Sequence, residues 1–175
     1  MIDHIVLDVD GTLTDGGITI SSDGTESKCF QAKDGLILRA MPRLGFTTMV
    51  ITGRASELTA VRAKDLAISV VYQGVADKAA VLGAYLQERG LDGSSVAYIG
   101  DDLNDCAAMR LCALRACPAD AAAEVRALCG YVSPLKAGHG AVRDVCEHIL
   151  REQGQYGDML GLFGVERNGE RRTRK

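Results

Sequence analysis

The sequence predicts an α/β fold, a three-layer, Rossmann-like parallel sheet with helices on both faces. Short apolar, β-branched segments alternate along the chain with longer segments of helical spacing, which is typical of βαβ crossovers between parallel strands. Reactive side chains follow several of the apolar segments, at the strand ends where open parallel sheets bind ligands. With 175 residues, the chain has room for one domain with a complete core.

The first segment, residues 4–9, is apolar and ends in carboxylates, as expected for a strand buried on both faces. Next, Asp23-Gly24 separates two alternating segments and predicts a projecting β-hairpin flap over residues 14–30. The other predicted strands are residues 47–51, 70–73 and 96–99, with short strands at 114–116 and 131–133. The predicted helices are residues 36–44, 57–66, 78–89, 104–111, 119–128 and 141–153.

The predicted domain ends near residue 153. Residues 154–175 contain glycine at five positions and finish in a basic run, which is the composition of a flexible tail. The tail also carries the apolar residues Met159, Leu160, Leu162 and Phe163. Two interpretations stay open: an unstructured end, or a lid that closes over an active site, in particular a neighbouring subunit's.

The composition is that of an ordinary globular protein, with 47% hydrophobic and 25% charged residues. A net charge of -3 provides no field that would attract nucleic acid or a membrane surface. We expect a cytoplasmic protein, because no basic leader precedes an apolar run and no segment approaches the roughly 20 apolar residues of a membrane span. The six cysteines contain no CxxC pair, and we expect them to be reduced.

Four carboxylates are predicted to meet at one edge of the sheet. Asp8 and Asp10 end the first strand, Asp101 and Asp102 follow the fourth, and Thr52 follows the second. Carboxylates that converge in this way repel one another unless a cation neutralises them. Mg²⁺ suits a site with few protein carboxylates, since it retains waters and bridges to substrate phosphate. The pattern therefore predicts a magnesium-dependent phosphoryl-transfer site.

Four segments, LDVDGTLTD, ITGR, Lys78 and IGDDLND, resemble the four motifs of the haloacid dehalogenase superfamily in order and spacing. The resemblance implies that Asp8 is the nucleophile and that Asp10 is the general acid and base. By the same resemblance, Thr52 and Lys78 hold phosphoryl oxygens.

The resemblance also implies a magnesium site. Its ligands are Asp8, the main-chain carbonyl of Asp10, and Asp101, while Asp102 and Asp105 hold these groups in place without touching the metal. Each residue also has a simpler interpretation: Asp10 as a turn residue, Lys78 as a solvated helix residue and Asp105 as a first-turn carboxylate. Thr52, likewise, is suited to capping a helix.

The chain has no room for a cap domain, and it resembles the cap-less subgroup of 3-deoxy-D-manno-octulosonate 8-phosphate phosphatases from about residue 5 to 153. This implies a sugar phosphate substrate and a homotetramer whose subunits complete each other's sites. We expect the hairpins to pack at its centre, with their alternating apolar residues Ile18, Ile20 and Phe30 buried between subunits. The substrate contacts implied are Gln31, Ala32, Lys33, Asp34, Gly35, Arg39, Gly53, Arg54, Arg62, Lys78 and Asn104. Lys33, Arg39 and Arg62 are equally compatible with exposed cations.

Two other functions stay open. Relatives that dephosphorylate nonulosonate sugars share GDDLND but tend to lack the arginine that is Arg54 here, so Arg54 favours the octulosonate. A catalytically silent homologue that only assembles other proteins would be free to lose Asp8 and Lys78, which are intact. One departure from the octulosonate enzymes is His139, which stands where they often have arginine.

Overall fold

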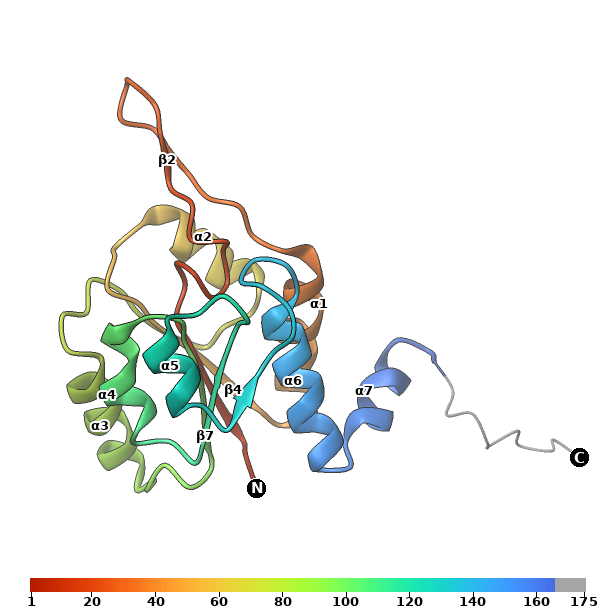
Figure 1. The fold of residues 1–175 in the computed structure, drawn as a ribbon. Coiled ribbons are helices and arrows are strands. Elements are labelled where there is room, and N and C mark those ends of the chain that lie inside the picture. Colours follow the sequence, from red (N-terminus) through yellow and green to blue (C-terminus); the bar gives the residue numbers. More distant parts are fainter. Residues whose placement is uncertain (166–175) are drawn as a thin grey trace, which may run out of the picture.

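The computed structural model describes residues 1–165 and contains a six-stranded sheet in the order β5-β4-β1-β6-β7-β8 (Figure 1). All neighbouring strands in it are parallel. The strands are β1 (His4–Leu7), β4 (Thr47–Ile51), β5 (Val70–Tyr72), β6 (Val96–Ile99), β7 (Leu114–Cys117) and β8 (Tyr131–Val132). The predicted parallel α/β fold is confirmed.

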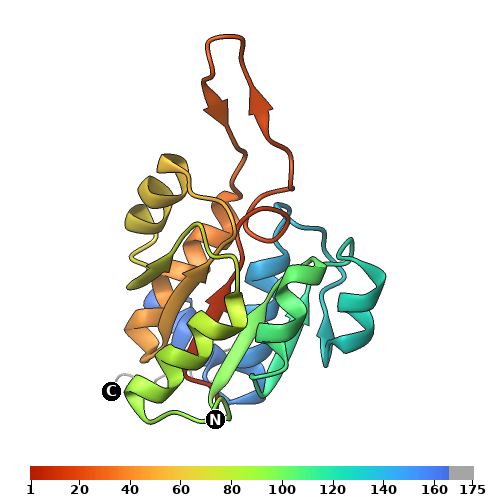
Figure 2. The ribbon, with the colours of Figure 1, turned by 90° about the vertical axis from the view of Figure 1, so that its left-hand side faces the viewer.

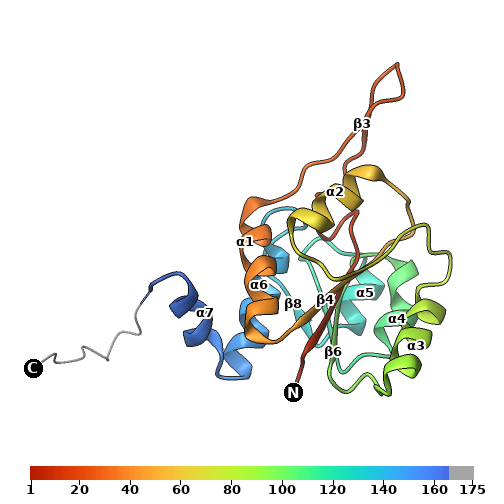
Figure 3. The same cartoon turned by 180° about the vertical axis from the view of Figure 1, so that it is seen from behind.

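Helices cover both faces of the sheet (Figure 3). One face carries α1 (Ala32–Ala40), α2 (Glu57–Asp65), α6 (Ala141–Glu152) and α7 (Tyr156–Leu162). The opposite face carries α3 (Lys78–Arg89), α4 (Cys106–Met109) and α5 (Ala123–Leu128). Two 3₁₀ helices, Met41–Leu44 and Leu103–Asp105, follow α1 and precede α4. No helix within residues 1–165 has the length and apolar character needed to cross a bilayer.

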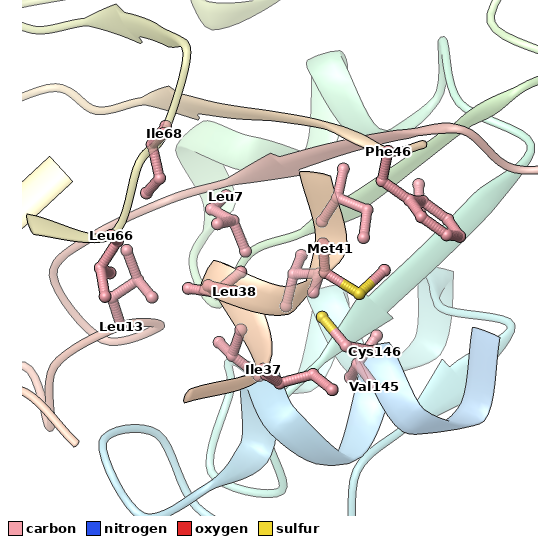
Figure 4. Close-up of a cluster of buried hydrophobic side chains, with 14 of the residues drawn as sticks. Leu7, Leu13, Ile37, Leu38, Met41, Phe46, Leu66, Ile68, Val145 and Cys146 are labelled. Carbon is pink, nitrogen blue, oxygen red and sulfur yellow. The ribbon is translucent and has the colours of Figure 1, made fainter. Parts of the chain in front are cut away.

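The core is split by the sheet, because successive strand side chains point to opposite faces. On β1, Ile5 and Leu7 join the cluster under α1 and α6, whereas Val6 joins the cluster under α3 and α4. Figure 4 shows the first cluster, to which Leu38, Met41 and Cys146 all belong. Burial on both faces explains why the strands are continuous apolar runs.

The predicted hairpin consists of the antiparallel strands β2 (Thr19–Ile20) and β3 (Glu26–Ser27). It projects from the body at the edge where the parallel strands end (Figure 2). A bridge between Thr14 and Phe30 closes its base. Ile20 is 67% exposed near the tip, so the hairpin offers an apolar side chain to solvent.

Several elements differ from the sequence prediction; α5, for example, begins at Ala123 instead of residue 119. Helix α1 begins at Ala32 instead of residue 36, because the side chain of Gln31 accepts the Lys33 N–H and caps the helix there. Residues 156–162, predicted to lie in a flexible tail, form α7, which packs on the core through the buried side chain of Met159. The basic end of the predicted tail, residues 166–175, lies outside the described residues.

Candidate active site

The candidate site lies at the carboxyl ends of the three central strands. β1 is flanked by β4 and β6, and the chain crosses from one side of β1 to the other between β5 and β6. Ligands bind at such a topological switch point in open α/β sheets. Asp8 follows β1, Thr52 follows β4 and Asp101 follows β6. The sheet therefore brings these three predicted residues to one edge.

Lys78 is the first residue of α3, and its side chain reaches inward between two carboxylates. Its ammonium nitrogen lies 2.9 Å from Asp8 Oδ1 and donates a 2.7 Å hydrogen bond to Asp105 Oδ1. Burial alone would lower the pKa of Lys78, but the charges of Asp8 and Asp105 raise it above its ordinary value. Lys78 is thus a buried, charged ammonium group, and its interpretation as a solvated helix residue is wrong.

Asp105 is fully buried and holds the loop after β6 in place. One of its oxygens also accepts a 2.8 Å hydrogen bond from the Tyr98 hydroxyl, and the other accepts the N–H groups of Asp101 and Asp102. Asp102 and Asp105 form a reciprocal capping box around residues 103–105. A Cβ at Gly100 would lie 2.6 Å from the Asp105 carboxylate, so glycine is needed for this close approach.

Asp101 faces the loop that follows Asp10. The Thr12 hydroxyl donates a 2.7 Å hydrogen bond to Asp101 Oδ1. Gly11 has a φ of +89°, and a Cβ there would lie 2.0 Å from Asp101 Oδ2. Only glycine permits both the left-handed backbone and this contact. The Asp-Gly-Thr sequence therefore forms a cradle for the Asp101 carboxylate.

The carboxylates around this cradle fit a divalent cation. Oxygens of Asp8, Asp101 and Asp105 lie within 4.8 Å of one another. The pKa of Asp8 is raised to about 6, mainly by burial and secondly by the charge of Asp105. Burial, with the charges of Asp8 and Asp105, raises the pKa of Asp101 to about 7. A cation would relieve this repulsion.

Two of the three carboxylates are free to bind such a cation. The oxygens of Asp105 already accept hydrogen bonds from Lys78, Tyr98 and two main-chain N–H groups. Asp8, by contrast, has a single cationic partner within the described residues, the Lys78 ammonium 2.9 Å from its Oδ1. The available ligands are therefore Asp8 and Asp101, both of which belong to the predicted ligand set.

Asp10 lies beside the base of the hairpin and faces two cations. Lys28 Nζ lies 2.7 Å from Asp10 Oδ1 and donates a 2.9 Å hydrogen bond to Oδ2. Arg54 Nε lies 3.8 Å from Oδ2, and the same guanidinium donates a 3.0 Å hydrogen bond to Glu26 on the hairpin. The hairpin is thus tied to Asp10 and Arg54 by charged groups.

Two further predicted residues lie close to Thr52, which is itself buried at the end of β4. A Cβ at Gly53 would lie 3.8 Å from the Asn104 side-chain nitrogen, so the loops after β4 and β6 approach each other here. Gly53 and Asn104 are both exposed. Their role as substrate contacts stays a prediction.

The remaining predicted contacts lie on α1 and α2. Arg62 donates to the carbonyl of Gln31, and Gly35 leaves room for its guanidinium, since a Cβ there would lie 2.6 Å from it. Asp34 is buried and accepts the N–H of Arg143 near the start of α6. These three contacts support the fold.

Other predicted contacts on α1 face solvent or another helix. Ala32 and Lys33 are exposed at the first turn of α1. Arg39 pairs with Asp65 of α2. The substrate contacts assigned to residues 31–35, Arg39 and Arg62 stay predictions.

Comparisons with known proteins identify the family. A family model described as haloacid dehalogenase-like hydrolase matches residues 54–144. The chain is 35% identical over 157 residues to the 3-deoxy-D-manno-octulosonate 8-phosphate phosphatase of Escherichia coli, which covers 90% of this chain and 84% of that protein. The chain belongs to the haloacid dehalogenase-like hydrolases.

Two solved phosphatase structures are similar to this chain in both sequence and fold. The phosphatase of Moraxella catarrhalis acting on 3-deoxy-D-manno-octulosonate 8-phosphate, solved with a magnesium ion, a phosphate ion and KDO, is 40% identical. It superposes with a TM-score of 0.89 over 93% of both chains. The cobalt-bound enzyme of Haemophilus influenzae is 31% identical, with a TM-score of 0.84 over 89% of this chain and 91% of that one.

Three residues at this hydrolase site were not predicted from the sequence: Thr12, Lys28 and Tyr98. Thr12 belongs to the Asp-Gly-Thr motif, so its place in that motif is enough to identify it as a candidate site residue. Tyr98 occurs within an apolar strand, where nothing in the pattern marks its hydroxyl. Lys28 occupies an alternating hairpin segment, and its inward direction depends on how the hairpin docks.

Proposed function

We propose that this protein is a magnesium-dependent phosphomonoesterase that hydrolyses 3-deoxy-D-manno-octulosonate 8-phosphate to the free sugar acid and inorganic phosphate. The observation that carries the proposal is the buried Asp8 carboxylate, which lies 2.9 Å from Lys78 at the end of β1 and beside Asp101. A carboxylate held beside an ammonium group and a cation site is suited to attack a phosphoryl group. The 40% identity to an enzyme solved with magnesium, phosphate and KDO supports this substrate.

In the proposed mechanism, an oxygen of Asp8 attacks phosphorus while the bond to the sugar oxygen breaks. Asp10 gives its proton to the departing alkoxide and later takes a proton from the water that hydrolyses the aspartyl-phosphate. Lys78 and Thr52 hold phosphoryl oxygens as charge develops on them. Magnesium, held by Asp8, Asp101 and the Asp10 carbonyl, would supply positive charge to the same oxygens.

The choice of an acidic sugar is supported by the cations next to Asp10. The Arg54 guanidinium is half exposed and its partner in this structure is Glu26, a carboxylate. The carboxylate of an acidic sugar would accept the same charge-assisted hydrogen bond from Arg54 in place of Glu26.

We also propose that the enzyme is a homotetramer in the cytoplasm. Without a cap, a single chain leaves the site open, and the projecting hairpin exposes Ile20. Light scattering at micromolar concentration should give four times the mass of one chain, and Ile20→Asp should lower that mass. An anionic sugar phosphate crosses bilayers poorly, so the enzyme has to lie in the compartment where its substrate is made, which we propose is the cytoplasm.

The experiment is a comparison of phosphate release from a panel of sugar phosphates, with and without Mg²⁺. We expect the octulosonate 8-phosphate to give the highest kcat/KM, and chelation to abolish its hydrolysis. A higher kcat/KM for a nonulosonate 9-phosphate would reassign the substrate. Absence of hydrolysis of every phosphate, including an aryl phosphate, would identify a catalytically silent homologue.

A further inference from the structure

The side chain of Lys28 points from the hairpin toward the body of the protein. Its neighbours Ser27 and Cys29 are exposed, whereas the Lys28 side chain has 0% exposure. The ammonium group lies within 2.9 Å of both oxygens of the Asp10 carboxylate. A residue of the hairpin therefore holds the proposed general acid in one orientation.

An ion pair is not needed merely to attach the hairpin. A buried ion pair seldom adds stability over apolar side chains of the same volume, because both charges lose hydration. The hairpin also has another anchor, the 3.0 Å hydrogen bond between Arg54 and Glu26. Its base is closed as well by the bridge between Thr14 and Phe30. The Lys28 contact with Asp10 therefore calls for a role in the reaction.

We propose that Lys28 is a positioning residue for Asp10, and that the hairpin thereby takes part in catalysis. This rests on the function proposed above. When the phosphorus–oxygen bond to the sugar breaks, the proton of Asp10 must pass to the departing oxygen as the bond to Asp8 forms. Proton transfer depends on a hydrogen-bonding distance and direction that a freely rotating carboxyl group seldom holds. Lys28 fixes that direction.

The role is specific to leaving groups that need a proton. A sugar alkoxide is a strong base and leaves poorly without one, whereas 2,4-dinitrophenolate leaves as a stable anion. Loss of positioning at Asp10 therefore slows only the first kind of reaction. Loss of hairpin attachment, by contrast, disturbs the site for both. The ratio of the two rates separates positioning from attachment.

The test compares the full-length wild type with Lys28→Met, Lys28→Arg and Asp10→Asn, each with Mg²⁺. The measured quantity is kcat/KM, which covers the steps through transfer to Asp8 and excludes the later hydrolysis common to both substrates. We expect Lys28→Met to reduce kcat/KM for the sugar phosphate by about 10²-fold. For 2,4-dinitrophenyl phosphate the reduction should be less than about 3-fold. Lys28→Arg should restore most of the loss.

Controls make each result decisive. Lys64→Met makes the same change at an exposed residue of α2 and should match the wild type on both substrates. Lys28→Met combined with Asp10→Asn should be no slower on the sugar phosphate than Asp10→Asn alone.

Three results would overturn the positioning role: equal losses on both substrates, no loss at all, or additive losses in the double variant. Thermal unfolding of Lys28→Met shows whether the variant folds, and if it does not, the ratio of rates for Lys28→Gln, which removes the charge but keeps a polar side chain, decides. A wild type that hydrolyses neither substrate would instead refute the proposed function.

Discussion

Lys78 and Asp105 form a hydrogen bond of 2.7 Å in which neither side chain is more than 1% exposed. Their residues are far apart in the chain, one opening α3 and the other ending the 3₁₀ helix after β6. Asp105 also accepts a hydrogen bond from the Tyr98 hydroxyl. The pair therefore links the helix layer, the central sheet and the loop that carries Asp101.

The first prediction concerns this pair. Asp105→Asn removes one of the two carboxylate charges beside the buried ammonium of Lys78 and should lower the free energy of unfolding by about 1.5–3 kcal/mol. Urea denaturation measures this. As a control, Asp65→Asn disrupts ion pairs with Arg39 and Arg62 at a side chain that is 44% exposed, and should cost less than about 1 kcal/mol. Equal losses in the two variants would contradict the importance of burial.

The second prediction concerns the nucleophile. Asp8→Asn keeps the shape of the side chain but removes the attacking oxygen's charge, and should reduce kcat by at least about 10³-fold, or about 4 kcal/mol. The variant should remain folded, because Lys78 keeps its bond to Asp105. Phosphate release and thermal unfolding measure the two effects. A folded variant with more than about a tenth of wild-type kcat would exclude Asp8 as the nucleophile.

Much of the fold could be predicted because its signals are local. The strands are short β-branched runs, and their alternation with helices requires parallel crossovers. The carboxylates at strand ends follow from the same reasoning, since parallel strands end at one edge. For this reason the sequence predicts that Asp8, Thr52 and Asp101 lie together, and the structure brings them to one edge of the sheet.

The remaining features depend on contacts between distant parts of the chain. Thr12 and Asp101 are 89 positions apart, and no local pattern pairs them. Lys28 is indistinguishable in sequence from an exposed hairpin lysine until the hairpin is docked on Asp10. Helix α7 was missed for a different reason: its glycines disfavour a helix, but packing of Met159 on the core outweighs that local preference.

The third prediction tests the contribution of α7. Met159→Ala removes a buried side chain from the main core cluster and should lower the free energy of unfolding by about 2–5 kcal/mol. Phe163→Ala serves as the control, because Phe163 follows the same helix but is 44% exposed, and it should cost less. Urea denaturation compares them. If Met159→Ala costs no more than Phe163→Ala, the C-terminal helix adds little to the domain.

The fourth prediction concerns magnesium and pH. In the metal-free protein the pKa of Asp101 is raised to about 7 and that of Asp8 to about 6, from an ordinary value of 3.8. The folded state therefore binds more protons than the unfolded state between about pH 4 and 7. The stability that these two carboxyl groups contribute is complete below pH 4 and is lost as the pH rises through 6 and 7.

Mg²⁺ binds the ionised carboxylates, so its stabilising effect should grow over the same range of pH. At pH 8 and a concentration about 100 times Kd, Mg²⁺ should add about 2.7 kcal/mol and raise Tm by roughly 5–10 °C. At pH 5 the increase should be much smaller. Thermal unfolding in Mg²⁺ and in chelator measures the difference, and Asp101→Asn should abolish most of its dependence on pH. An equal increase in Tm at pH 5 and pH 8, or an unchanged response in Asp101→Asn, would show that the ion binds elsewhere.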